Sequence, residues 1–414
     1  MLPSVRHLLH RQIWQRLPRS ARRDVFLRLT AFLAPRPRAA LPARQPLIVA
    51  GSLRSSSGLG QSARLCYAAL AGAGFDVRVA DLTTDAFQDT DLPVFEAPDG
   101  RRHEGSGTLI LHINGPLVPL ALLRLGRRFL AGKRIIGYWA WELPEVGPDW
   151  RRGVPFVHEI WVPSEFVAHA VQPVAQGVPV RVVPHPVALL CPPVAPRRAL
   201  ESRPFTVLCV FNMASGFTRK NPVAAIEAFK AAFGDDASAR LLLKATNLGV
   251  HPDGRRALEQ AIAGAGNIHL SEDAVTSSAM VQLYDTADIL VSLHRSEGFG
   301  LVMAEAMLRG LAVVATDWSG NRDFLTVERG CPVHYRLVKA LDPQGVYDNP
   351  RMVWAEPDVS SAAAALRRLR DDATVRLALG EAGMRFGREV WSAERYAELV
   401  SRHLAPLAAP SRPE

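Results

Sequence analysis

The stretch from Ala287 to Thr316 reads ADILVSLHRSEGFGLVMAEAMLRGLAVVAT, and it is the part of the chain that predicts the fold class. The apolar run DILVSL ends at a glycine-containing turn, a helix-forming segment starts near Leu301, and a second apolar run, AVVAT, follows. Continuous apolar strands that alternate with helices are typical of a parallel sheet covered on both faces. The stretch therefore predicts a strand–helix–strand unit of a doubly wound α/β domain.

The same alternation extends outward through most of the 414 residues, in two series separated by a proline-rich stretch. The first series starts with the apolar run Leu47–Ala50 and the second with Thr206–Phe211. Two doubly wound domains in tandem form a cleft between the carboxyl ends of their sheets. We predict an α/β chain of two tandem Rossmann-like domains, with a basic tail at 1–44, the first domain at 45–190, a linker at 191–204, the second domain at 205–385, and a C-terminal helix and tail at 386–414.

Composition and charge exclude several classes of protein. Hydrophobic residues make up 48% of the chain and charged residues 21%, as in globular proteins. No apolar run approaches the roughly 18 residues of a membrane span. Residues 1–44 hold ten arginines and one acid, whereas the remaining residues hold 39 basic and 39 acidic side chains. The net charge of +9 therefore belongs to the tail, and the body is not expected to bind nucleic acid.

The tail has the spacing of amphipathic helices. Pro18 ends a first helix, and Ser20 is a candidate cap for a second one, whose apolar positions are Val25, Phe26, Leu29, Phe32 and Leu33. Two interpretations stay open: residues 1–33 lie on an anionic membrane surface, or they dock on the body. The first residues contain no uninterrupted apolar leader, and the four cysteines form no metal-binding pattern. We expect a cytoplasmic protein, with peripheral attachment to the inner face of the cytoplasmic membrane as the alternative for the tail.

The turn after DILVSL carries the residues that predict chemistry. Gly298 and Gly300 allow a ligand to approach the backbone, and the free amides at the helix start near Leu301 suit an anion. Glu297 lies in the turn and Glu305 about one turn into the helix, so both carboxylates can address one cleft. One of them can hold the hydroxyls of a ribose and the other those of a sugar. The alternative is that Glu305 complements the helix dipole while Glu297 is solvated.

This segment resembles the E-x7-E signature of family 4 of the retaining glycosyltransferases, which have the GT-B fold. The resemblance runs through most of residues 46–400 and includes EIWVPSEFVA, RKNPVAAIEAFKAAF and TDWSGNRDF. It implies that the second domain binds a nucleotide-sugar donor, with Phe299 and Leu301 beside the turn glycines in the pocket. It also implies that the first domain binds the acceptor, and that the terminal helix crosses back to the first domain.

The resemblance implies that Lys220 holds the donor diphosphate and that Arg219 assists it. A lysine and helix-start amides stabilise the charge of a leaving diphosphate without a metal ion or other cofactor. Many relatives have an arginine about five residues before the lysine, where this chain has NMASG with Ser215. Ser215 therefore replaces an expected second cationic contact.

The first domain contributes a glycine-rich loop, RSSSGLGQSA, whose Gly58 and Gly60 bring backbone amides toward the diphosphate or the transferred sugar. The pattern G-x-G-x-x-A, with Asp81 23 residues after Gly58, also matches a dinucleotide site and so allows an NAD(P)-dependent oxidoreductase. Seven residues separate the strand from Gly58, however, whereas a dinucleotide turn follows its strand directly. That alternative also leaves the two glutamates unexplained.

Two further segments end strands at the predicted cleft. Asn114, in LHINGP, stands where many relatives carry a histidine that touches the sugar, and it has no titratable proton. Glu142 lies beside two tryptophans in GYWAWELPEVG, a combination that suits a sugar acceptor or a packed core edge equally well. The D-x-D string at Asp89–Asp91 lies in a plain loop, so no metal site is expected there.

Together these features predict a metal-independent glycosyltransferase, and the resemblance implies that it retains the anomeric configuration. It would move a sugar, with mannose as one candidate, from a nucleotide sugar to a hydroxyl of a glycan or lipid-linked acceptor in cell-surface polysaccharide synthesis. A different class is a catalytically idle module of the same fold that binds sugar nucleotides without turning them over.

Overall fold

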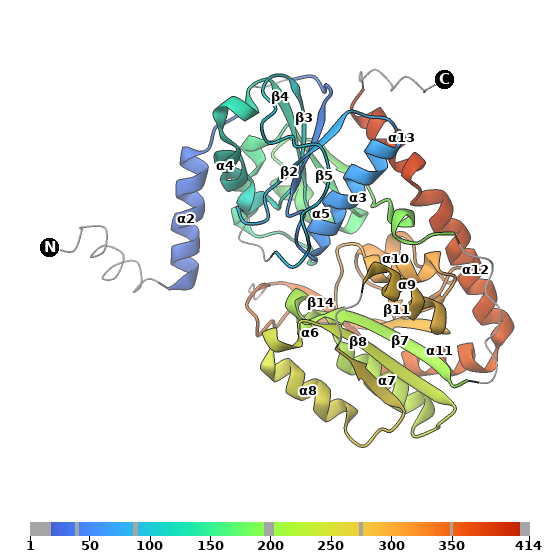
Figure 1. Cartoon of the computed structure of the whole chain (residues 1–414). Coiled ribbons are helices and arrows are strands. Elements are labelled where there is room, and N and C mark those ends of the chain that lie inside the picture. The colour runs from blue at the N-terminus through green and yellow to red at the C-terminus, as the bar shows by residue number, and fades with distance from the viewer. Residues whose placement is uncertain are drawn as a thin grey trace, which may run out of the picture.

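The computed structural model describes residues 18–37, 41–85, 90–193, 203–272, 276–347 and 351–405. The first helix predicted in the tail, before Pro18, lies outside these ranges, as does Asp89. Two α/β domains lie one above the other (Figure 1), and each is built on a six-stranded parallel sheet. This confirms the predicted fold class.

The first sheet has the strand order β2-β1-β3-β4-β5-β6. Its strands are β1 (Leu47–Gly51), β2 (Val77–Asp81), β3 (Gly107–His112), β4 (Lys133–Tyr138), β5 (Glu159–Val162) and β6 (Val180–Val182). The central strand β1 is buried along its whole length, with Leu47 paired to Val77 on one side and to Thr108 on the other. The helices of this domain are α3 (Gly58–Gly72), α4 (Val118–Leu130) and α5 (Glu165–Val171).

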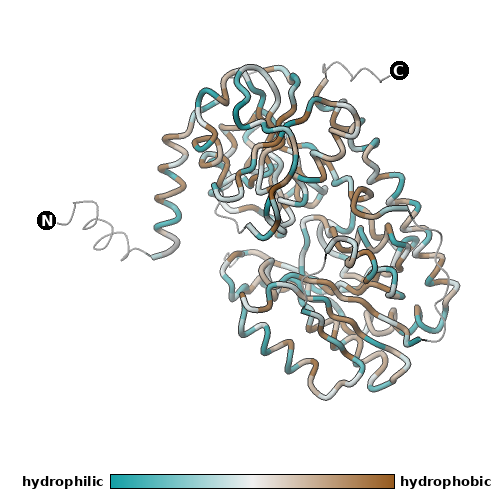
Figure 2. Tube along the Cα trace, in the orientation of Figure 1, coloured by the Kyte–Doolittle hydropathy of each residue, from teal (hydrophilic) through white to brown (hydrophobic). Residues whose placement is uncertain are grey.

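The second sheet has the order β12-β11-β10-β7-β8-β9. Its strands are β7 (Phe205–Asn212), β8 (Ala239–Thr246), β9 (Ile268–Ser271), β10 (Ile289–Ser292), β11 (Ala312–Thr316) and β12 (Cys331–Val333). Its helices are α6 (Phe217–Lys220), α7 (Pro222–Phe233), α8 (Pro252–Ile262), α9 (Ser277–Thr286), α10 (Leu301–Leu308) and α11 (Val359–Asp371). In Figure 2, hydrophobic residues follow the central strands and hydrophilic residues follow outer helices such as α8, which is the pattern expected of a sheet covered on both faces.

Two C-terminal helices connect the domains. Helix α12 (Ala373–Val390) runs along the second domain, and α13 (Ala393–His403) returns to the first, where it packs against α3 (Figure 1). Tyr396 and Val400 of α13 are buried in the same hydrophobic cluster as Leu70 of α3. This is the return crossing that the resemblance implies.

Helix α2 (Arg19–Leu33) docks on the first domain beside α4 (Figure 1). Leu27, Thr30 and Ala34 face inward, and Asp24 pairs with Arg152. The apolar positions singled out in the sequence lie mostly on the opposite face, where Val25, Leu29, Phe32 and Leu33 are exposed. Pro18, rather than Ser20, occupies the N-cap position. Among the described helices, none has the length and apolar content needed to cross a bilayer.

A two-stranded antiparallel hairpin, which the sequence pattern did not predict, follows the second sheet. Its strands are β13 (Tyr335–Lys339) and β14 (Val353–Pro357), paired from Tyr335 with Pro357 to Lys339 with Val353. It extends the second domain toward the first (Figure 1).

Trp391, between α12 and α13, tests how strongly this junction supports the fold. Its ring is buried and lies 5.1 Å from the ring of Phe324 and 5.5 Å from that of Phe386. Because Trp391→Ala leaves a cavity, we expect it to lower the free energy of unfolding by about 3–5 kcal/mol. The neighbouring Val390→Ala, at an exposed position, is expected to change it by less than about 0.5 kcal/mol. Chemical denaturation would contradict this expectation if the two variants had the same midpoint.

Candidate active site

The short helix α6 presents two cations toward the turn that follows β10. Gly216, with a φ of 96°, starts α6, and Asn221, with a φ of 51°, ends it before Pro222 begins α7. This sharp pair of turns places Arg219 and Lys220 beside the turn residue Glu297. The predicted lysine and the first predicted carboxylate therefore meet in space.

Glu297 is held by both cations. The Nζ atom of Lys220 lies 2.5 Å from Oε1, and Nη1 of Arg219 lies 3.2 Å from Oε2. Arg219 also donates hydrogen bonds to the backbone carbonyl oxygens of Ser296 and Ser215, each at 2.7 Å. Ser215 thus contributes its carbonyl group, rather than a cation, to this site. We call Arg219, Lys220 and Glu297 the charge cluster.

Electrostatics keep Glu297 ionised. Its burial alone would raise the pKa, but the positive charges of Lys220 and Arg219 outweigh this effect and lower the pKa of Glu297 to about 2. Arg219 and Glu297 are only 3% and 8% exposed, so water screens this attraction little.

The turn glycines allow the two domains to approach each other. A Cβ on Gly298 would lie 2.7 Å from the carbonyl oxygen of Trp141 in the first domain, and Gly300 has a φ of 103°. The Oγ atom of Ser164, also in the first domain, donates a 2.6 Å hydrogen bond to the carbonyl of Gly298. The predicted glycines therefore lie at the domain boundary. Side chains would separate the domains at Gly298 and strain the backbone at Gly300.

The other two turn residues that the sequence singled out face different surroundings. The ring of Phe299 is buried in the interior, 4.9 Å from the ring of His185 and 5.4 Å from that of Phe324. Leu301 is half-buried at the start of α10. The Phe299 ring therefore packs within the protein.

The second carboxylate, Glu305, lies apart from the charge cluster. Its Oε2 atom accepts a 2.9 Å hydrogen bond from the hydroxyl of Tyr284 on α9, and no contact recorded among the described residues links it to Glu297 or Lys220. Burial raises the pKa of Glu305 to about 7, although the hydrogen bond from Tyr284 opposes the rise. The two glutamates thus occupy electrostatically different places.

The first domain brings Glu142 to the charge cluster. The Oδ1 atom of Asn114 accepts a 2.9 Å hydrogen bond from the backbone amide of Ala140, and this fixes the segment that leads to Glu142. The negative charge of Glu142 acts on both Arg219 and Tyr347 of the second domain. Asn114 is therefore a support for this segment, and Glu142 lies in the interdomain site.

The glycine-rich loop leads into α3. Ser57 caps the helix by accepting a hydrogen bond from the Gly60 amide. A Cβ at Gly60 would lie 2.5 Å from the carbonyl oxygens of Ser52 and Ser55, whereas Gly58 has open space around it. Gly60 is thus required by packing, and Gly58 is the position with room for a ligand. Asp81, the acid of the dinucleotide alternative, accepts a 3.0 Å hydrogen bond from the Thr83 amide.

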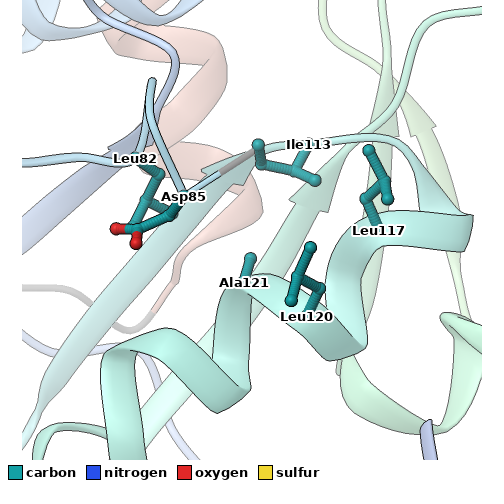
Figure 3. Close-up of a pocket in the computed structure, with 6 residues that line it drawn as sticks. All are labelled: Leu82, Asp85, Ile113, Leu117, Leu120 and Ala121. Carbon is teal, nitrogen blue, oxygen red and sulfur yellow. The ribbon is translucent and has the colours of Figure 1, made fainter. Parts of the chain in front are cut away.

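An apolar pocket lies at the carboxyl edge of the first sheet, beside α4 (Figure 3). It is lined by Leu82, Asp85, Ile113, Leu117, Leu120 and Ala121. Asp85 is paired at 2.7 Å with Arg101. None of these residues belongs to the charge cluster, but Ile113 and Leu117 flank Asn114 in the chain.

The described residues contain no group of three His, Cys, Asp or Glu side chains placed to hold a metal ion. Asp91 of the D-x-D string accepts a 2.8 Å hydrogen bond from the Ser56 amide. Catalysis without a metal stays a prediction.

Two residues of the site were not predicted from the sequence. Tyr284 contacts Glu305, and Tyr347, on the hairpin, lies over Arg219. Neither stands in a motif, because each reaches the site from an element whose place depends on the tertiary fold.

Comparisons with known proteins agree with this architecture. Residues 204–371 match the family model described as glycosyl transferases group 1. Sucrose-phosphate synthase from Thermosynechococcus elongatus is 17% identical, with a TM-score of 0.61 over 88% of this chain and 98% of its own. HepE from Anabaena, solved with UDP and glucose, is 13% identical, with a TM-score of 0.60 over 88% of this chain and 99% of its own.

TarM from S. aureus, solved with UDP and α-GlcNAc-glycerol, is 13% identical with a TM-score of 0.51. The alignment covers 72% of this chain, which spans 55% of TarM. No curated protein matches the chain. These findings confirm the GT-B fold for the chain and, for the second domain, the resemblance to group 1 glycosyltransferases. The assignment to family 4 and to its E-x7-E signature stays a prediction.

The raised pKa of Glu305 predicts a pH dependence of stability. The folded protein keeps this proton up to pH about 7, whereas an unfolded chain releases it near pH 4.5. The free energy of unfolding should therefore fall as the pH rises from about 4.5 to 7, by up to about 3 kcal/mol. We expect Glu305→Gln to remove this loss, as measured by denaturation at pH 5, 6, 7 and 8. Glu227→Gln, at an exposed position on α7, is the control and should keep it.

Proposed function

We propose that this chain is a retaining glycosyltransferase that moves a sugar from a nucleotide-sugar donor to a hydroxyl group of a glycan or lipid-linked acceptor. The observation that carries the proposal is the charge cluster at the domain boundary. A buried arginine and a half-buried lysine meet there beside a turn whose Gly298 lets the first domain approach closely. The group 1 family match, which covers these residues, supports the same conclusion.

In the proposed reaction, Lys220 and Arg219 bind the diphosphate of the donor. Negative charge develops on that group as the bond to the sugar breaks, and fixed cations in a water-poor site stabilise it. Retention follows if the acceptor attacks from the face that the diphosphate leaves, with the departing phosphate taking the proton of the acceptor hydroxyl. The protein then mainly orients the two substrates.

The remaining residues have distinct proposed roles. Glu297 holds hydroxyl groups of the transferred sugar while it is fixed by the two cations. Glu305 accepts hydrogen bonds from the ribose, and these donors would favour the ionised form of a carboxyl whose pKa burial raises to about 7. Glu142 and the carboxyl edge of the first sheet, near Asn114 and Gly58, bind the acceptor or the sugar.

The choice of donor is guided by the structural neighbours. TarM and HepE were solved with UDP, and HepE also with UDP-glucose. UDP sugars are therefore tested first, with GDP-mannose beside them because mannose is the sugar suggested by the sequence resemblance. A glycan acceptor is consistent with synthesis of a cell-surface polysaccharide.

Release of free nucleotide tests the catalytic proposal. We expect Lys220→Met and Glu297→Gln to lower the turnover of the preferred nucleotide sugar by about 100-fold or more. The first removes a cation from the leaving diphosphate, and the second removes the carboxylate that holds the hydroxyl groups of the sugar. Lys230→Met on α7 is the matched control and should stay within about twofold. Thermal unfolding shows whether each variant is folded.

Two outcomes would overturn this proposal. Folded variants with the turnover of the original protein would refute the roles of Lys220 and Glu297. A protein that is stabilised by a nucleotide sugar but never releases the nucleotide would be the idle binding module instead.

We further propose that α2 attaches the protein to the inner face of the cytoplasmic membrane. Its docked face holds it on the first domain, and its outer face exposes Leu29 and Phe32, the latter at 81%. Arg28 flanks this face with a side chain that is 71% exposed, although it pairs with Asp24, and its positive charge favours anionic lipids. Arg23 instead pairs with Asp149 of the first domain. In this proposal, one face of α2 docks on the first domain and the opposite face contacts the membrane.

Vesicle co-sedimentation tests this attachment. We expect binding to phosphatidylglycerol vesicles and little binding to phosphatidylcholine vesicles. Phe32→Ser should weaken the binding about tenfold or more, because a buried phenylalanine ring contributes roughly 2 kcal/mol. Val250→Ser, at an exposed position of the second domain, is the control and should bind like the unchanged protein. Equal binding of the Phe32→Ser variant would refute the role of α2.

A further inference from the structure

The hairpin β13–β14 is anchored to the element that carries the charge cluster. Arg295 pairs with Glu356 of β14 at 2.8 Å and donates a 2.6 Å hydrogen bond to the carbonyl of Thr218 in α6. The backbone amide of Ala355 donates to the carbonyl of Arg295 at 2.9 Å. These contacts hold the base of the hairpin against α6, and Figure 1 shows β14 beside α6 at the boundary between the domains.

The loop after β13, residues 340–347, is shaped by one carboxylate. Asp342 accepts hydrogen bonds from the backbone amides of Gln344, Val346 and Tyr347, at 3.1, 2.9 and 3.2 Å. The Oε1 atom of Gln344 in turn accepts a 3.0 Å hydrogen bond from the Phe217 amide at the start of α6. The loop is therefore ordered by its own contacts, and it delivers Tyr347 to a defined place.

Tyr347 lies between the two domains. Its ring centroid is 5.3 Å from that of Trp141 in the first domain and 5.9 Å from the guanidinium carbon of Arg219 in the second. Leu143 of the first domain is fully buried in the same apolar cluster as Tyr347. Burial raises the pKa of Tyr347 well above its usual value, so its hydroxyl stays protonated and can donate to Glu142.

Arg219, beside this ring, has one hydrogen-bond donor that no group among the described residues accepts from. Its Nε atom is buried without a hydrogen-bond partner, although both terminal nitrogens are engaged. A buried guanidinium N–H without a partner is costly, and a phosphate oxygen would satisfy it. Tyr347, itself only 5% exposed, places its ring beside this guanidinium and against Trp141 of the first domain.

We propose that Tyr347 is a positioning residue that closes the donor site between the two domains, leaving its place over Arg219 to admit a nucleoside diphosphate sugar and returning once the donor is bound. This inference rests on the proposed function, because the group that Tyr347 covers is the proposed phosphate site. Its contacts with Trp141 and Leu143 make the closed hairpin part of the domain interface. A closed site also keeps water from the reacting sugar, so that transfer prevails over hydrolysis of the donor.

The first experiment measures closure in the full chain without any ligand. Hydrogen–deuterium exchange is followed in residues 139–147, which lie across the interface from the hairpin. Tyr347→Ala should speed exchange there about tenfold, because opening becomes easier when the ring contacts are lost. Tyr347→Phe keeps the ring and should stay within about twofold. Leu341→Ala, in the same loop but 72% exposed, is the matched control and should change nothing.

The second experiment measures the fate of the preferred nucleotide sugar. In the Tyr347→Ala variant, the ratio of donor hydrolysis to transfer should rise about tenfold, with Tyr347→Phe restoring the original ratio. Trp141→Leu removes the same ring contact from the side of the first domain, so it should also speed exchange and raise the ratio of hydrolysis to transfer. It replaces Tyr347→Ala in both experiments if that variant does not fold.

The two experiments separate failure of this inference from failure of the proposed function. Faster exchange in Tyr347→Ala without turnover of any nucleotide sugar would support the closure and refute the transferase. The role of Tyr347 would be refuted if the Tyr347→Ala variant turned over a nucleotide sugar with the same exchange rate and the same ratio of hydrolysis to transfer as the Leu341→Ala variant. A Tyr347→Phe variant that behaves like Tyr347→Ala would also refute it, since the proposal assigns the contact to the ring.

Discussion

The pairing of Glu297 with Lys220 and Arg219 is the interaction on which the rest of the site depends. A carboxylate as buried as Glu297 is stable only where positive charges and hydrogen bonds compensate for lost water. The partners come from a helix 77 residues earlier in the chain, so the pairing fixes α6 against the turn after β10. The backbone amide of Glu297 donates to Ser319 at 2.8 Å and ties the same turn to the segment after β11. The segments after three strands thus meet at one residue, through its carboxylate and its backbone amide.

The same turn also sets the distance between the domains. Gly298 meets Trp141 and Ser164 of the first domain, and the Glu165 amide donates a 2.9 Å hydrogen bond to Asp323 of the second. A side chain at Gly298 would push the backbones apart and withdraw Glu142 from Arg219. The glycine pattern is therefore explained as much by the domain interface as by a ligand. In this chain the interface and the candidate site are one place.

The sequence predicted what local pattern determines and missed what tertiary placement determines. Buried parallel strands read as continuous apolar runs, so both sheets were visible, and the turn with Glu297 was visible from its glycines. The hairpin was not predicted, because β13 and β14 are short and only partly buried. Tyr347 was not singled out, because its contact with Trp141 of the other domain forms only in the folded protein. Helix α2 was predicted, but its docked face was not. Leu27 and Thr30 pack inward there and Asp24 pairs with Arg152 of the first domain, contacts that no periodicity reveals.

The different surroundings of the two glutamates bear on where the proton of an acceptor hydroxyl goes. A pKa of about 2 leaves Glu297 with almost no affinity for a proton near neutral pH, so it is a poor general base. Glu305 has a suitable pKa, but its carboxylate faces Tyr284, apart from the cations that would hold the diphosphate. Asn114, with its Oδ1 atom engaged by Ala140, has no titratable proton. In the proposed reaction these side chains supply charge and orientation, and the base within reach of the acceptor is the departing phosphate of the donor itself.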